Sequence, residues 1–218
     1  MNKRLFLVAG LLLGLALACG GGSSSPQAAQ VSTAKHLVYT DPIGGGWRLV
    51  QDAISTPTRM VLDLVGPSGT YSRGVGFNLQ ASSGVHFGTF AETGYPVNDT
   101  GVYELLSQYP TYPLEPKLLV GGVKPGNLLT VGIFQKDRRM SAKDSGSALC
   151  QIALELDPAV SVYPGDALTL SVPKAKIMAG DIGAPGLSGW ANDAEFYDAQ
   201  SKARLVPIAI AVGTLVAQ

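Results

Sequence analysis

The sequence predicts an all-β fold, specifically a two-sheet antiparallel β-sandwich with one or two short helices. Apolar and polar residues alternate in several short runs, which is the period of a strand with one buried face. The 27 glycines and 14 prolines of the 218-residue chain are scattered between these runs, a distribution typical of many turns. Two sheets packed face to face would bury so many alternating faces within one domain.

The first half of the domain contains four predicted strands and one long irregular segment. The strands are expected over residues 36–40, 47–50, 58–65 and 75–79. Residues 81–117 are rich in glycine, proline and tyrosine, and they form the longest segment without a regular pattern. Within that segment, Asp99 or Thr100 is a candidate cap for a short helix over residues 102–108.

The second half returns to strand patterns. Strands are expected over residues 117–123, 128–135, 148–156, 168–172 and 174–179. Residues 124–127 (Lys-Pro-Gly-Asn) form a predicted hairpin turn between the first two of these strands. The uncharged run over residues 205–216 is expected to be a closing strand, either buried on both sides or with a sheet edge at Pro207.

The N-terminal residues have the organisation of an export signal. Lys3 and Arg4 precede an apolar run that ends at Ala18, and this run is too short for a permanent membrane helix. We therefore predict a signal peptide over residues 1–18. The Gly/Ser-rich stretch over 19–34 has no apolar face to bury and is predicted to be a flexible tether. A single β-sandwich domain is expected over 35–218.

The end of the signal, Leu15-Ala16-Leu17-Ala18-Cys19, resembles a bacterial lipobox. This resemblance implies that Cys19 becomes the mature N-terminus and carries the lipid, including palmitate-type acyl chains. Several acyl chains on one residue anchor a protein stably to a membrane. In a Gram-negative cell, the same resemblance implies that Gly20, in place of an aspartate, leads to release to the outer membrane of the cell envelope. The alternative is an ordinary secretory signal with an unrelated cysteine.

Four segments of the domain share a second resemblance. Residues 61–64, 74–79, 129–134 and 146–154 follow one another in an order that resembles a cohesin-type β-sandwich. That fold is shared by carbohydrate-scaffold docking modules and some carbohydrate-binding modules. The resemblance implies a cohesin-like or Ig-like sandwich, and such a fold alone does not decide function.

Motifs for catalysis, metal binding and nucleic-acid binding are absent from the sequence. His36 and His86 have no metal-ligand spacing, and balanced charge gives no nucleic-acid footprint, so we expect no cofactor and no metal. Cys150 lies on the apolar face of a predicted strand and is expected to be buried and inert. The acidic group Asp193 to Asp198 is expected to be solvated loop charge, with a calcium site as the alternative.

The remaining candidates for contact with a partner are aromatic. The candidate binding residues are Trp47, Tyr95, Tyr103, Tyr109, Tyr112 and Trp190. Tyrosine and tryptophan supply rigid contact area with a polar tip, although the same side chains could pack against the sandwich. We expect a membrane-anchored, non-catalytic module that binds a protein partner. The alternatives are a polysaccharide-binding module, a hydrolase without a recognisable motif and a structural envelope subunit.

Overall fold

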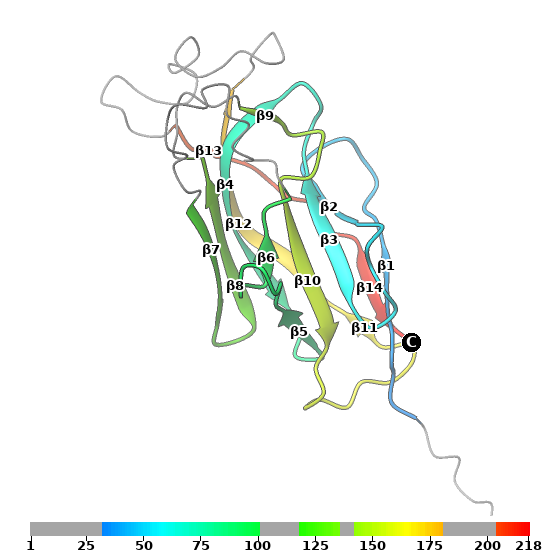
Figure 1. The fold of residues 1–218 in the computed structure, drawn as a ribbon. Helices are drawn as coiled ribbons and strands as arrows, with labels where there is room; N and C mark the ends of the chain where they lie inside the picture. Colours follow the sequence, from blue (N-terminus) through cyan, green and yellow to red (C-terminus); the bar gives the residue numbers. More distant parts are fainter. Residues whose placement is uncertain (1–31, 101–117, 136–141, 181–203) are drawn as a thin grey trace, which may run out of the picture. The chain divides into compact units, whose positions relative to one another are not determined.

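The computed structural model describes residues 32–100, 118–135, 142–180 and 204–218, and the described part is built from antiparallel β-sheets (Figure 1). One sheet, called here the β3–β10 sheet, has the order β2 (Arg48–Gln51), β3 (Met60–Val65), β10 (Cys150–Leu156), β5 (Val85–Gly88), with β6 (Val97–Asn98) also paired to β10. The second, the β4–β8 sheet, has the order β13 (Val206–Pro207), β12 (Leu170–Gly180), β4 (Tyr71–Ala81), β8 (Leu128–Phe134), β7 (Leu118–Lys124), with β9 (Lys143–Asp144) paired to β4.

A small third sheet joins the two ends of the domain. Its order is β1 (Leu37–Thr40), β14 (Thr214–Ala217), β11 (Ala167–Leu168). The backbone amides of Lys35 and His36 donate hydrogen bonds of 2.7 and 2.8 Å to the Gln218 carbonyl. The beginning of the described domain therefore lies beside the C-terminal residue Gln218.

One continuous apolar core lies between the two large sheets. Leu62 of β3 and Ile152 of β10 are fully buried on one side, and Val75 of β4 and Ile133 of β8 on the other. The same core includes side chains of the third sheet, such as Leu215 of β14. The alternating pattern of these strands thus specifies which face of each one turns inward. The predicted all-β sandwich is confirmed for the described residues.

Most of the predicted strands are confirmed to within two residues, and the Lys-Pro-Gly-Asn turn is confirmed between β7 and β8. Gly126 and Asn127 have φ angles of 82° and 58°, the left-handed region that such tight turns use. No helix occurs among the described residues, and none of them forms a segment with the length and apolarity of a membrane-crossing helix. The candidate helix over residues 102–108 lies outside the described residues.

Four predictions about strands need correction. β4 is longer than predicted, and the irregular segment contains β5 and β6. The strands predicted over 168–172 and 174–179 are mainly one strand, β12, in which a register irregularity between Ser171 and Lys174 accommodates Pro173. The closing strand buried on both sides is wrong. Residues 205–216 form only the short strands β13 and β14, and Leu205, Val206 and Pro207 are exposed. Pro207 lies on an edge strand, as the alternative predicted.

Candidate functional site

The strand register of the β4–β8 sheet defines the side chains on its outer face. Residues that face each other across β7, β8, β4 and β12 point to the same side. One such row is Val120, Gly132, Gly76 and Lys176, and the next is Gly122, Thr130, Asn78 and Lys174. Each row therefore combines residues with almost no side chain and residues with a long one.

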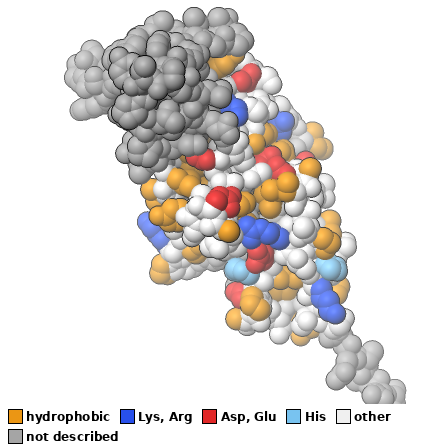
Figure 2. Space-filling model, in the orientation of Figure 1, with side chains coloured by type: hydrophobic (Ala, Val, Ile, Leu, Met, Phe, Trp, Pro, Cys, Tyr) orange, Lys and Arg blue, Asp and Glu red, His pale blue; other side chains and the backbone are white. Residues whose placement is uncertain are grey.

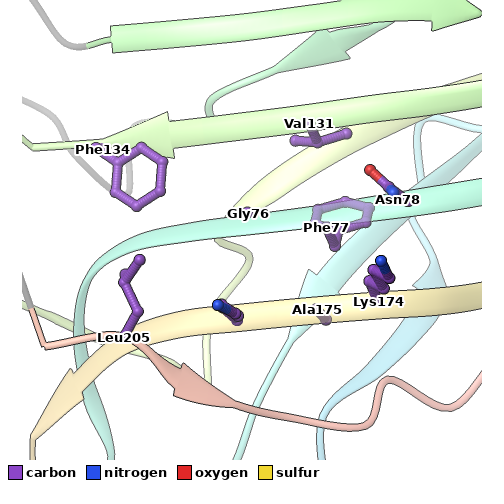
Figure 3. Close-up of a pocket in the computed structure, with 9 residues that line it drawn as sticks. Gly76, Phe77, Asn78, Val131, Phe134, Lys174, Ala175 and Leu205 are labelled. Atoms are coloured by element: carbon purple, nitrogen blue, oxygen red, sulfur yellow. The ribbon is translucent and has the colours of Figure 1, made fainter.

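The short side chains leave a hollow, called here the trough, with a volume of about 280 Å³ (Figure 3). The lining residues are Gly76, Phe77, Asn78, Val131, Phe134, Lys174, Ala175, Lys176 and Leu205. Phe77 and Val131 are nearly fully buried members of the core, so they contribute to the floor. The side chains that rise around the trough come from four strands or their immediate flanks: β8, β4, β12 and the residue before β13.

The glycines of this face are not required by backbone conformation, because none of Gly76, Gly122 and Gly132 has a positive φ angle. A Cβ atom on Gly76 would make ordinary contacts, 3.5 Å to the Val131 carbonyl oxygen and 3.6 Å to the Phe134 ring. A Cβ atom on Gly122 would meet nothing within 4 Å. A glycine inside a strand weakens it, and it often marks a place where another molecule approaches the backbone closely.

Other glycines of the fold have their side-chain space filled by the chain itself. The ring of Phe134 lies where a Cβ atom of Gly74 would be, and the Trp47 ring occupies that space at Gly66. Phe134 also packs against the small outer cluster of Tyr71, Ala142 and Met178. The space at Gly76 and its row neighbour Gly132 is different, since the Phe134 ring and the Val131 carbonyl oxygen approach it only to ordinary contact distances of 3.5–3.6 Å.

The rim of the trough combines apolar and basic groups. Leu205 is 42% exposed, and Phe134 is partly exposed above the floor. Lys174 and Lys176 are exposed on β12, and Asn78 lies beside Lys174 (Figure 3). The arrangement can hold an apolar group on the floor while the lysine and asparagine side chains donate hydrogen bonds at its border.

The outer face of the opposite β3–β10 sheet carries charges of both signs close together (Figure 2). Arg59 Nη1 lies 2.6 Å from Glu155 Oε1, and the Arg59 guanidinium is 4.9 Å from the centre of the Phe90 ring. His86 Nε2 lies 3.3 Å from Glu155 Oε2, and its Nδ1 lies 3.0 Å from the Leu156 carbonyl. The charges of this group are therefore compensated within the chain.

A pair of carboxyl groups lies on the same face. Asp52, at the end of β2, and Asp63 of β3 are joined by a hydrogen bond. Burial, followed by the hydrogen bond and the charge of Asp52, raises the pKa of Asp63 to about 7. Burial acts to raise the pKa of Asp52 also, but hydrogen bonds from the Ile54 amide, Asp63 and Gln151 hold it below its ordinary value. A proton shared by the pair is therefore held more strongly by Asp63 than by Asp52.

This carboxyl pair is a candidate acid and base, and sequence reasoning missed it. A hydrolase would need such a pair beside a hollow that admits substrate. The trough lies on the other sheet, however, and a second hollow of about 400 Å³, which Gln51 and Ser55 help to line, does not include Asp52 or Asp63 either. The hydrogen bonds of the pair instead tie the turn after β2 to β3 and β10.

Two of the six aromatic residues that the sequence suggested for partner binding, Trp47 and Tyr95, are among the described residues. The Trp47 ring packs over Gly66 and against the core, and Tyr95 is 43% exposed beside Gly121 of β7. These two side chains lie at opposite edges of the sandwich, next to β2 and β7. Cys19, Tyr103, Tyr109, Tyr112, Trp190 and the acidic group 193–198 lie outside the described residues.

Cys150 is completely buried, as predicted, and burial raises the pKa of its thiol. Among the described residues, no three histidine, cysteine, aspartate or glutamate side chains gather where they could hold a metal ion. Sequence reasoning missed the trough, although Gly74 and Gly76 alternate with apolar Val75 and Phe77. That spacing leaves one face of a strand without side chains.

No protein-family model and no curated protein matches this chain. Among solved structures, it is similar to the "Cohesin module from Clostridium perfringens ATCC13124 family 33 glycoside hydrolase". The TM-score is 0.36 and the sequence identity is 9%, over 82% of this chain and 98% of that chain. A similarity of this size gives no information on partners, so what the chain binds has to be argued from its own residues.

Proposed function

We propose that this protein is a lipid-anchored lipoprotein of the bacterial envelope whose β-sandwich binds a protein partner through the outer face of the β4–β8 sheet. The observation that carries the binding proposal is the trough. Its central glycines, Gly76 and Gly132, are required neither by a positive φ angle nor by close packing of another part of the chain against them. Strand glycines of this kind suit close approach by a partner.

The exposed apolar side chains of this sheet favour a protein partner. Val120 lies in the same row as Gly76 and is 46% exposed, and Leu205 and Val206 are exposed at the other edge. Aliphatic groups around a hollow fit the apolar core of a protein interface, where contact area excludes water. Sugar recognition relies more on the open faces of aromatic rings, and Trp47 is engaged in packing.

The position of the domain entrance supports the anchoring proposal. Residues 35 and 36 pair with Gln218 at the end of the sandwich where β4 finishes, and Lys124-Pro125-Gly126-Asn127 turns at that end too. A tether that starts at a lipidated Cys19 would hold the sandwich by this end. The outer face of the β4–β8 sheet would then stand along the side of the anchored domain, accessible to a partner in the envelope.

The binding proposal is tested by filling the trough without disturbing the fold. Gly76→Ala combined with Gly132→Ala places two methyl groups on the floor, both at ordinary contact distances. The matched control, Gly45→Ala combined with Gly46→Ala, adds the same two methyl groups to a loop where nothing lies within 4 Å. Each protein is used to capture partners from solubilised envelope, and the captured proteins are identified by mass spectrometry.

The proposal predicts one defined partner that wild type and control retain equally and that the trough variant loses. Equal retention by all three proteins would exclude the trough as the binding surface. The anchoring proposal is tested separately by Cys19→Ala, which should move the protein from the membrane fraction to the soluble fraction with its fold intact.

A further inference from the structure

The outer face of the β4–β8 sheet is basic, although the chain as a whole is balanced with 16 basic and 16 acidic residues. The four rows that the strand register defines on this face contain Lys124, Lys174 and Lys176 and no aspartate or glutamate. The opposite face carries Asp52, Asp63 and Glu155. The four rows around the trough are therefore basic, whereas the opposite face carries charges of both signs, with Arg59 paired to Glu155.

The two lysines at the trough are available to an incoming group. Lys174 and Lys176 are exposed, and within the described ranges neither has an ion-pair partner. They are two residues apart on β12 and point to the same side, so their Cα atoms are separated by roughly 6.6 Å. Carboxylates at positions i and i+2 of an extended segment have the same spacing.

The trough beside the lysines is apolar and shaped for a side chain. Its floor is backbone at Gly76, and Phe134 and Leu205 rise beside it. A flat layer of lipid headgroups has the negative charge but does not project an apolar group into a hollow between strands. A peptide segment provides both, because carboxylate and apolar side chains project from the same chain.

On the basis of the proposed function, we infer that the partner meets the trough with an extended acidic peptide segment. An apolar side chain of that segment is seated on Gly76 against Phe134 and Leu205. Carboxylates of the segment pair with Lys174 and Lys176, and these exposed ion pairs set specificity and the rate of association more than total affinity.

The test begins with a phage-displayed library of random dodecapeptides, selected on the full-length chain in detergent. A fluorescein-labelled synthetic copy of the most enriched peptide is then titrated by anisotropy. The proteins compared are wild type, Lys174→Ala combined with Lys176→Ala, Gly76→Ala, and two controls. The controls are Lys35→Ala, which removes an exposed lysine at the domain entrance, and Gly45→Ala.

We expect enrichment of aspartate or glutamate together with large apolar residues. The lysine double variant should bind roughly tenfold more weakly at low salt, and the difference should shrink as salt screens the ion pairs. Gly76→Ala should also weaken binding, whereas both controls should bind like wild type.

Selected peptides without acidic bias, or equal affinity in the lysine double variant, would overturn the inference. Failure to select peptides, together with binding to anionic phospholipid vesicles that requires both lysines, would replace the peptide by a lipid surface. If envelope capture depends on the trough glycines but not on the lysines, the proposed function stands and only the acidic-segment inference is wrong.

Discussion

The carboxyl pair on the β3–β10 sheet predicts that stability falls as pH rises toward neutrality, and Asp63→Asn tests this. Asp63 keeps its proton in the folded protein up to a pKa of about 7, whereas the unfolded chain releases that proton near its ordinary pKa of 3.8. Between these pH values the folded state binds more protons than the unfolded state. Stability conferred by the neutral carboxyl is therefore complete below about pH 4 and is lost as pH rises through 7.

The magnitude follows from the difference between the two pKa values. Each pKa unit corresponds to about 1.4 kcal/mol, which sets an upper limit of about 4 kcal/mol for an isolated group. The lowered pKa of Asp52 changes stability only below its ordinary value of 3.8, outside the range from pH 5 to pH 8, whereas the partial exposure of the pair to solvent weakens the effect of Asp63. We expect wild type to lose ~2 kcal/mol of unfolding free energy between pH 5 and pH 8 through this pair.

The assay is urea unfolding of wild type, Asp63→Asn and a control, Glu92→Gln, at pH 5 and pH 8. The asparagine amide can still donate a hydrogen bond to Asp52 but does not titrate, so Asp63→Asn should be much less sensitive to pH over this range. Glu92 is an exposed carboxylate, and its replacement should leave the wild-type pH dependence unchanged. If Asp63→Asn loses as much stability as wild type between pH 5 and pH 8, the shared-proton interpretation is wrong.

Three further predictions concern the core and the glycines. Tyr39→Phe should destabilise the domain by about 1–3 kcal/mol in urea unfolding, because the buried hydroxyl bonds the Leu49 carbonyl at 3.0 Å and the Gly213 amide at 2.6 Å. Gly74→Ala should lower the melting temperature, because the Phe134 ring occupies the Cβ position, whereas Gly76→Ala should not. Cys150 in the folded protein should resist a thiol reagent at pH 8 and react fully in urea, and rapid labelling of folded protein would contradict its burial.

The strands that sequence predicted well have one face in the core and one in solvent. In β8 this produces strict alternation, which is visible without knowledge of the partner strand. In β3 and β10 the core-facing apolar residues also recur at every second position, although Val61 and Ala153 on the outer face are buried too. β5 has only four residues and ends in glycine, so its pattern is too short to separate from a loop. The sequence pattern predicted two strands in place of β12 because a proline commonly ends a strand. In the structure, a local register shift accommodates Pro173 within one strand.

The candidate site was less predictable because it depends on pairing between strands. Gly76 and Gly132 are far apart in sequence and become neighbours only through the register of β4 with β8. Glycine is also common in turns, so a glycine in the sequence does not by itself indicate a strand surface without side chains. The pairing of Arg59 with Glu155 likewise requires that β3 and β10 lie side by side. Local patterns specify which face of a strand is buried, but not which strands meet.

The most direct test of the central claim is photo-cross-linking in intact cells from the row that contains the trough. A photoreactive amino acid replaces Val120, which is exposed beside Gly132. In a matched control it replaces Ile54, which is 58% exposed next to the opposite sheet. Our account predicts a discrete protein adduct from position 120, absent from position 54 and lost when the trough is filled. An adduct from position 54 alone, or one from position 120 that persists with the trough filled, would contradict it.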